Sequence, residues 1–143
     1  MKKHVAILSF VLLLLFVSIS FAADLSEDEK DLCQFVLEQY PEELQPMMEV
    51  EINSYRAGKE VYLYVKLNEI ALGTQAKNIA IVAVQGALEW LMAKGHDPAK
   101  EWISVNCRPY AREKGATGKD LRRVWGKADY DWNTDQIKWV PAN

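Results

Sequence analysis

Residues 48–67 contain two runs in which apolar and polar side chains alternate, and this pattern constrains the fold more than any other feature of the sequence. In the first run, Met48, Val50 and Ile52 share one face of the predicted strand. The second run, which follows a turn at residues 56–59, has apolar residues at positions 61, 63, 65 and 67. The pattern predicts a β-hairpin with one buried face. The polar face is predicted to carry Glu49, Glu51, Asn53, Tyr55, Tyr62, Tyr64 and Lys66.

Helices are predicted on both sides of this hairpin. Ser26 and Glu29 have the Ser-x-x-Glu spacing of a capped helix N-terminus, and Pro41 ends that first helix. A second helix is predicted with Thr74 as its N-cap and Gly95 just past its C-terminus. Apolar residues cover most of its circumference, which predicts burial on several sides or contact with another subunit.

Three more strands are predicted after the second helix, at residues 102–108, 121–130 and 136–140. The chain order is then one helix, two strands, one helix and three strands. Because hairpins dominate this order, we expect an α+β fold in which an antiparallel sheet of about five strands carries two helices on one face.

The first 22 residues have the features of a secretory signal peptide. Lys2 and Lys3 precede an apolar run at residues 5–19, and Ser20 and Ala22 supply the small residues of a cleavage site. The alternative is an uncleaved membrane anchor, because the run approaches the length of about 20 residues that spans a bilayer. We therefore expect residues 23–143 to form a single exported domain, periplasmic or secreted, without a membrane span after cleavage.

Charge is distributed unevenly over the predicted mature chain, which has 15 basic and 20 acidic side chains. This balance argues against a general nucleic-acid binder, which would be basic overall. Residues 24–51 hold ten acids and one base, whereas residues 108–127 hold seven bases and two acids. Either the two regions face and partly neutralise each other, or the basic region binds an anionic partner.

Cys33 and Cys107 are the only cysteines of the chain. In the oxidising compartment that an exported chain enters, an even pair of cysteines predicts a disulfide bond. Both residues fall on apolar faces, so we expect their side chains to meet in the core. The bond would close a loop of about 75 residues and stabilise the fold by roughly 4 kcal/mol. A redox or nucleophilic cysteine is the alternative, but the C-x-x-C spacing is absent.

The segment EKGATGKDLRRVWGK, residues 113–127, has the glycines and lysine of a phosphate-binding loop but not their spacing. Two residues separate Gly115 from Gly118 where the loop needs four, and Asp120 follows Lys119 where a hydroxyl residue is required. The segment is instead predicted to connect two strands.

Oxygen-bearing side chains occur at alternate positions of residues 129–135, as in the first half of a calcium loop, at Asp129, Asp131, Asn133 and Asp135. The second half of such a loop does not follow, because Thr134 and Val140 replace the required glycine and glutamate. A hairpin turn is the structural alternative. His96, just past a helix end, is predicted to be a capping or surface residue. The sequence therefore predicts no metal site and no cofactor.

The predicted interaction residues belong to the polar sheet face and to the basic segment. Aromatic rings with polar tips suit a platform for a peptide, a glycan or a protein, and basic side chains attract anions. The predicted set is Tyr55, Tyr62, Tyr64, Trp102, Arg108, Arg112, Lys114, Lys119, Arg122 and Arg123. The alternative is that a loop, the hairpin 125–139 or a second subunit covers this face.

These features predict an exported binding or accessory protein of the cell envelope rather than an enzyme. Its partner is predicted to be an envelope protein, a peptide or an anionic ligand. One alternative is a hydrolase that uses Asp129, Asp131 or Glu49, which would need a pocket holding a carboxylate of raised pKa. The other is a structural homodimer joined through the helix 74–94.

Overall fold

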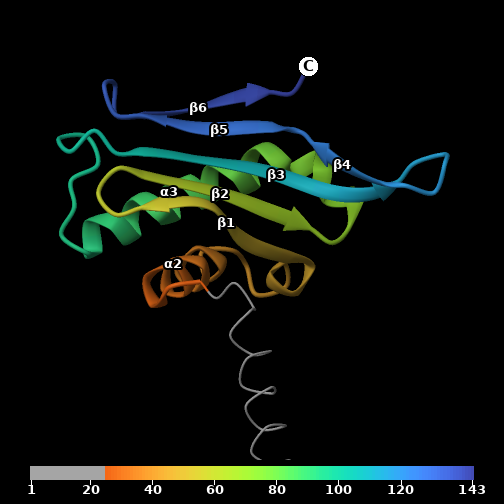
Figure 1. Ribbon diagram of the computed structural model, residues 1–143, viewed down its shortest axis with the longest axis horizontal. Coiled ribbons are helices and arrows are strands. Elements are labelled where there is room, and N and C mark those ends of the chain that lie inside the picture. Colours follow the sequence, from red (N-terminus) through yellow and green to blue (C-terminus); the bar gives the residue numbers. More distant parts are fainter. Residues whose placement is uncertain (1–24) are drawn as a thin grey trace, which may run out of the picture.

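The computed structural model describes residues 25–143 (Figure 1). The predicted signal peptide, residues 1–22, therefore lies outside the described residues. The elements in chain order are α2 (Glu27–Leu37), η1 (Gln45–Met47), β1 (Met48–Arg56), β2 (Glu60–Leu67), η2 (Ile70–Gln75), α3 (Ala76–Ala93), β3 (Ser104–Lys114), β4 (Asp120–Val124), β5 (Gly126–Asp131) and β6 (Gln136–Pro141). No helix among residues 25–143 is long and apolar enough to cross a membrane.

The six strands form one mostly antiparallel sheet in the order β1-β2-β3-β5-β6, with β4 also paired to β3. The predicted α+β class is confirmed. One connection was not predicted: β2 and β3 run parallel, with Leu63 beside Cys107, and α3 is the crossover between them. A parallel pair needs such a long connection, whereas antiparallel neighbours need only a short turn.

Helix α2 begins as the capping signature predicts. The Ser26 hydroxyl accepts a hydrogen bond from the Glu29 N–H at 3.2 Å and donates one to the Glu29 carboxylate at 3.0 Å. The helix buries Leu32 and Val36. It packs against α3 and β1, and Trp90 of α3 donates a hydrogen bond from Nε1 to Asp31 at 2.8 Å.

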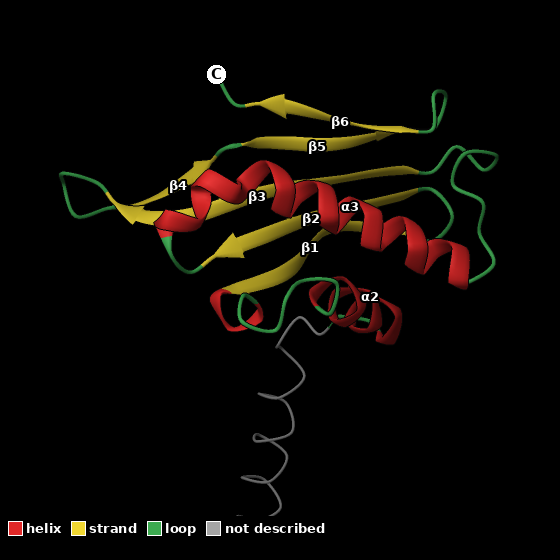
Figure 2. Cartoon of the chain, turned by 180° about the vertical axis from the view of Figure 1, so that it is seen from behind, coloured by secondary structure: helices red, strands yellow, loops and turns green. Residues whose placement is uncertain are grey.

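Helix α3 lies across one face of the sheet (Figure 2). It begins one residue later than predicted, because η2 occupies residues 70–75 and Gln75 rather than Thr74 is the N-cap. Its C-terminus is as predicted: Gly95 has a φ of +90°. The Gly95 N–H bonds to the Met92 carbonyl, and the His96 N–H bonds to the Leu91 carbonyl. This pair of bonds is a Schellman motif, in which glycine accepts the left-handed conformation without steric cost.

The core lies between α3, α2 and the covered sheet face. Residues at alternate positions of β2 and β3 point into it, and Val61, Leu63, Val65, Val105 and Cys107 are all at most 1 % exposed. Within the described residues, no helix lies over the opposite face (Figures 1 and 2). The polar residues of the predicted alternation lie on this open face.

Tyr55 is the exception, and its predicted place on the open face is wrong. A β-bulge between Ile52 and Ser54 shifts the register of β1. The extra residue moves the following side chains to the other face, so Tyr55 lies on the covered side. Its ring packs edge-on against Trp90, with centroids 6.1 Å apart.

A second irregularity divides the strand that was predicted at residues 121–130. Tyr110 of β3 pairs with Val124 of β4, whereas Cys107 pairs with Ala128 of β5. The register therefore slips by one residue at Trp125 and Gly126, between β4 and β5. Residues 115–119 form the tip of the β3–β4 hairpin, closed by hydrogen bonds from Gly115 N–H to Lys119 and from Gly118 N–H to Gly115. The predicted strand connection at this segment is confirmed.

The predicted disulfide is not formed, and both cysteines are free thiols. Cys107 is fully buried on β3, in register with Leu63 of β2. Cys33 is half-buried on α2, in a hollow that it shares with Glu49, Val50 and Glu51 of β1. The two residues therefore lie on opposite sides of β2. The apolar pattern of the sequence correctly predicted burial at Cys107, but it could not show that a strand lies between the two cysteines.

Candidate functional site

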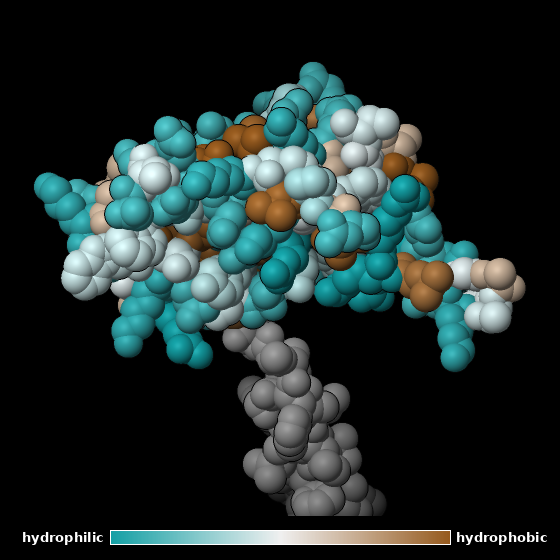
Figure 3. All heavy atoms as spheres, turned by 90° about the horizontal axis from the view of Figure 1, so that it is seen from above, coloured by the Kyte–Doolittle hydropathy of each residue, from teal (hydrophilic) through white to brown (hydrophobic). Residues whose placement is uncertain are grey.

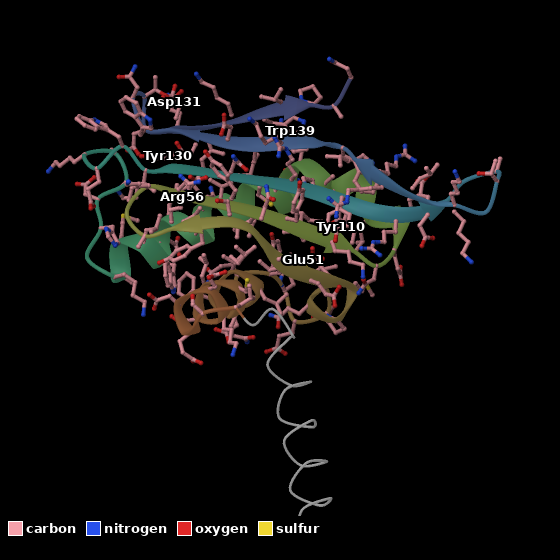
Figure 4. All side chains as sticks on the ribbon, viewed as in Figure 1. Glu51, Arg56, Tyr110, Tyr130, Asp131 and Trp139 are labelled. Carbon is pink, nitrogen blue, oxygen red and sulfur yellow. The ribbon has the colours of Figure 1, made fainter. Side chains whose placement is uncertain are left out.

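The acidic and basic regions of the chain do not neutralise each other. Among residues 25–143, no ion pair joins residues 25–51 to residues 108–127. The one polar side-chain contact between them is a hydrogen bond of 2.6 Å that the Tyr110 hydroxyl donates to Glu51 (Figure 4). The basic region therefore keeps most of its charge available to other molecules.

Basic and aromatic side chains gather on the open face of the sheet, where β2, β3 and β4 lie side by side. The parallel register places Tyr62 beside Asn106 and Tyr64 beside Arg108. We call the following set the basic sheet face: Tyr62, Tyr64, Arg108, Tyr110, Arg112 and Arg122.

Arg122 is held on this face by aromatic rings. Its guanidinium carbon lies 4.3 Å from the centroid of the Tyr110 ring and 4.9 Å from that of Tyr64. The two tyrosine rings meet edge to face, with centroids 5.5 Å apart. Cation–π contacts of this kind orient a guanidinium without neutralising its charge.

Tyr110 forms the buried base of the cluster. Burial raises its pKa to about 12, and the hydrogen bond to Glu51 adds to this shift. The phenol is therefore neutral over the whole physiological range and acts as a hydrogen-bond donor. It fixes the position of the ring on which Arg122 lies.

Arg112 and Arg122 are directly opposed in the β3–β4 ladder. Like charges at such a position destabilise a sheet. Within residues 25–143, no ion pair involves Arg108, Arg112 or Arg122. By contrast, Arg123 lies on the other face, where it pairs with Glu113 at 3.1 Å and stacks over Trp125. The basic sheet face thus holds three cations that have no ion-pair partner among residues 25–143.

The structure brings together five of the ten predicted interaction residues: Tyr62, Tyr64, Arg108, Arg112 and Arg122. Lys114 and Lys119 are exposed near the hairpin tip. Tyr55 and Arg123 are on the opposite face, and Trp102 lies in the loop before β3.

Tyr110 is a member that the sequence interpretation missed, because that strand was expected to end at Arg108, before Pro109. A proline lacks the N–H that a central strand needs. Pro109 is tolerated because it lies where the pairing passes from β5 to β4. On that side, the β5 pairs end at Cys107 and the β4 pairs begin at Tyr110. Continued alternation beyond Arg108 is the signal that would have identified Tyr110.

The carboxylates of residues 129–135, the segment that resembles half of a calcium loop, bind separate partners. Asp129 pairs with Lys127 at 3.5 Å, Asp131 with Lys138 at 3.3 Å, and Asp135 accepts a hydrogen bond of 2.7 Å from Tyr130. Residues 25–143 contain no group of three or more His, Cys, Asp or Glu side chains placed to hold a metal ion. The segment forms a hairpin turn in which the Asp131 carboxylate accepts from the Asn133 N–H, and this bond is the main reason that the pKa of Asp131 is lowered.

The hydrolase alternative required a pocket that holds a carboxylate of raised pKa. In the described part of the chain, the carboxyl groups with a clearly shifted pKa are Asp31, Glu101 and Asp131, and all three are shifted downward. A hollow of about 460 Å³ is bordered by Leu88, Met92, His96, Asp97, Tyr130 and Asp135. His96 bonds to Glu101 at 3.0 Å, and that bond is the first cause of the lowered pKa of Glu101. This arrangement favours ionised carboxylates rather than a general acid.

Neither cysteine is in an environment that activates a thiol. Burial raises the pKa of Cys33 to about 11, and Glu29 and Glu51 add to the shift. Burial also raises the pKa of Cys107. Because the thiolate is the nucleophile, we expect iodoacetamide at pH 8 to alkylate Cys33 about a hundredfold more slowly than an unperturbed thiol. Cys107 should not react until the protein unfolds.

Mass spectrometry of timed alkylation reactions tests this expectation. A urea-unfolded sample is the control, in which both cysteines should react at the rate of a free thiol. Rapid alkylation of Cys33 in the folded protein would show that the pKa of this thiol is not raised.

No protein-family model matches the chain, and the comparisons with curated proteins and with solved structures find no match. The fold and the surface define a class in physical terms: an α+β protein with an open, basic and aromatic sheet face. The function is therefore inferred from this face alone.

Proposed function

We propose that the protein is an exported, non-enzymatic binding protein that docks the acidic surface of a partner protein onto the basic sheet face. Export is inferred from residues 1–22, and it puts the partner in the periplasm or outside the cell. The observation that carries the proposal is the opposed pair Arg112 and Arg122, neither of which forms an ion pair with a carboxylate of residues 25–143.

The composition and shape of the face support a protein partner. Tyrosine and arginine are enriched in the energetically important parts of protein interfaces. Arg108 and Arg112 are four residues apart on one strand, a separation of about 13 Å. A single small anion does not span that distance, whereas several carboxylates on a protein surface do. Beside Arg108 lies an open hollow of about 270 Å³.

Exchange of Arg112 for glutamate tests the proposal. Arg112→Glu should lower the amount of partner captured from an envelope extract about tenfold, because attraction across the interface becomes repulsion. The same change should raise the free energy of unfolding by about 0.5 kcal/mol, since it replaces two opposed cations with an opposed ion pair. Quantitative mass spectrometry of the captured proteins and urea unfolding measure the two effects.

Arg123→Glu is the matched control, because Arg123 lies in the same hairpin but on the other face. It should leave capture unchanged and should lower stability, since its ion pair with Glu113 is lost. The variant Tyr62→Ala/Tyr64→Ala should also lose capture. Equal capture by wild type, Arg112→Glu and the tyrosine variant would refute the proposed function.

A further inference from the structure

Two tryptophans are exposed together at one end of the sheet, away from the basic sheet face. Trp102 is 68 % exposed and Trp132 is 40 % exposed. Their ring centroids lie 6.1 Å apart and their planes are inclined at 51°. Trp102 belongs to the loop before β3, and Trp132 to the β5–β6 turn beside Asp131, which Figure 4 labels. We call these two residues the tryptophan pair.

This exposure is not part of a broad apolar surface. Figure 3, which looks onto the β6 edge, shows hydrophobic residues in separate small patches among hydrophilic ones. Two large rings in contact with each other and with water leave apolar area uncovered, although burying that area would stabilise the fold. Isolated surface hydrophobic residues need no explanation, but a contacting pair of indoles is typical of an interaction site.

The loops hold the tryptophan pair in place. Trp102 has a φ of +57°, a left-handed conformation that is strained for a bulky side chain. Hydrogen bonds from Ile103 N–H to Pro98 and from Glu101 N–H to Asp97, each 2.9 Å, enforce this turn. On the other loop, the Asn133 N–H bonds to the Asp131 carboxylate at 3.0 Å. The backbone that carries each ring is therefore preorganised, which reduces the entropy lost when a ligand binds.

The two segments that carry the tryptophan pair contain more acidic than basic side chains, in contrast to the basic sheet face. The loop before β3 and the segment from Asp131 to Lys138 hold four acids, Asp97, Glu101, Asp131 and Asp135, and three lysines, Lys94, Lys100 and Lys138. All three lysines pair with carboxylates, Lys94 with Asp31 at 3.4 Å, Lys100 with Asp97 at 3.6 Å and Lys138 with Asp131 at 3.3 Å. Glu101 immediately precedes Trp102, and Asp131 immediately precedes Trp132. Glu101 and Asp135 are then the two carboxylates of these segments that form no ion pair with a lysine or arginine, and they leave negative charge beside the exposed rings.

We propose that the tryptophan pair is a docking site for an arginine or lysine side chain in a cationic segment of a partner. The faces of tryptophan rings attract cations more strongly than those of other aromatic residues, and the adjacent carboxylates attract the same charge. The site is distinct from the basic sheet face, which has the opposite sign. A membrane surface is disfavoured, because the acidic loops would be repelled by anionic lipid headgroups.

The test uses defined probes on the mature protein. A tetra-arginine peptide, a tetra-glutamate peptide, a neutral oligosaccharide and phosphatidylglycerol vesicles are each titrated and followed by calorimetry and tryptophan fluorescence. We expect binding of the arginine peptide alone. Trp102→Ala and Trp132→Ala should each weaken it about tenfold, although both keep all charges of the site.

Leu121→Ala is the matched control, because Leu121 is 54 % exposed on β4, outside the two loops. It should bind the arginine peptide as wild type does. Trp132→Phe keeps an aromatic ring and should lose less affinity for the arginine peptide than Trp132→Ala. This comparison separates loss of the aromatic contact from loss of binding through altered folding. Arg112→Glu should still bind the peptide, so that failure of the proposed function is distinguished from failure of this site.

Three results would overturn the proposal. The first is no measurable binding of the arginine peptide to wild type. The second is equal affinity in wild type, Trp102→Ala and Trp132→Ala, which would show that general electrostatic attraction, and not the tryptophan rings, binds the peptide. The third is tryptophan-dependent binding of the oligosaccharide or of the vesicles, which would assign the pair to a different partner.

Discussion

Gly126→Ala is expected to lower the free energy of unfolding by about 3 kcal/mol or more, the largest effect of any single change considered. Gly126 has a φ of +154°, a region open to glycine and strained for other residues. A methyl group there would lie 2.6 Å from Cζ2 of Trp139 and 2.9 Å from Cα of Pro141. The change therefore adds backbone strain to a clash with the backbone of β6.

Urea unfolding of Gly126→Ala beside Gly118→Ala separates these two costs. Gly118 also has a positive φ, +77°, but no atom lies within 4 Å of its added methyl group. Its substitution should cost about 1 kcal/mol, from backbone strain alone. If the two variants were equally stable, the close contact with β6 would have no energetic consequence and the expected clash would be wrong.

Gly73→Ala is expected to have the second largest effect, about 3 kcal/mol, for a different reason. Gly73 lies in η2, and its added methyl group would overlap the van der Waals surface of the Trp125 ring, 2.7 Å from Nε1. Trp125 lies between the end of β4 and the start of β5. The indole is also stacked against Arg123, so it cannot move freely away from the added methyl group.

A double-mutant cycle tests this contact. Trp125→Leu removes the ring atoms that would clash, so Gly73→Ala should cost at least about 1 kcal/mol less in the Trp125→Leu background than in wild type. Unfolding free energies of wild type, the two single variants and the double variant supply the measurement. Strict additivity would mean that the cost of Gly73→Ala arises elsewhere in η2.

Both predictions concern the junction that positions β4. The one-residue slip at Trp125 and Gly126 lets β3 pair with two successive strands along the same side. Because β4 pairs in this register, Arg122 lies opposite Arg112 and over the rings of Tyr64 and Tyr110. Partial loss of partner capture in Gly73→Ala, measured where the protein remains folded, would connect this junction to the basic sheet face.

Local sequence patterns were sufficient wherever the structure depends on neighbouring residues. The capping signature at Ser26, the glycine at the end of α3 and the hairpin of β1 and β2 were each predicted from spacing alone. The α+β class also followed, because the order of helices and strands was largely readable. Each of these features is stabilised by interactions along one short segment, so its signal is contained in that segment.

The candidate site could be predicted only in part. Alternation placed Tyr62, Tyr64 and Arg108 on one face, and the charge count indicated that residues 108–127 are basic. Tyr55 was assigned to the wrong face, because one extra residue in β1 inverts the alternation and leaves no clear mark in the sequence. The pairing of the two cysteines was wrong for a related reason: apolar alternation indicates burial but not which strands lie in between.

The sequence by itself determined the helices, the hairpins, the covered face of the sheet and the uneven distribution of charge. Only the tertiary structure decided that β2 and β3 are parallel neighbours, that Arg112 opposes Arg122, and that Trp102 meets Trp132. These are contacts between residues distant in the chain, fixed by strand register and by the packing of α3 across the sheet. A periodic pattern specifies which side of a strand faces the core, but the free energy of the whole packed arrangement selects the strand beside it.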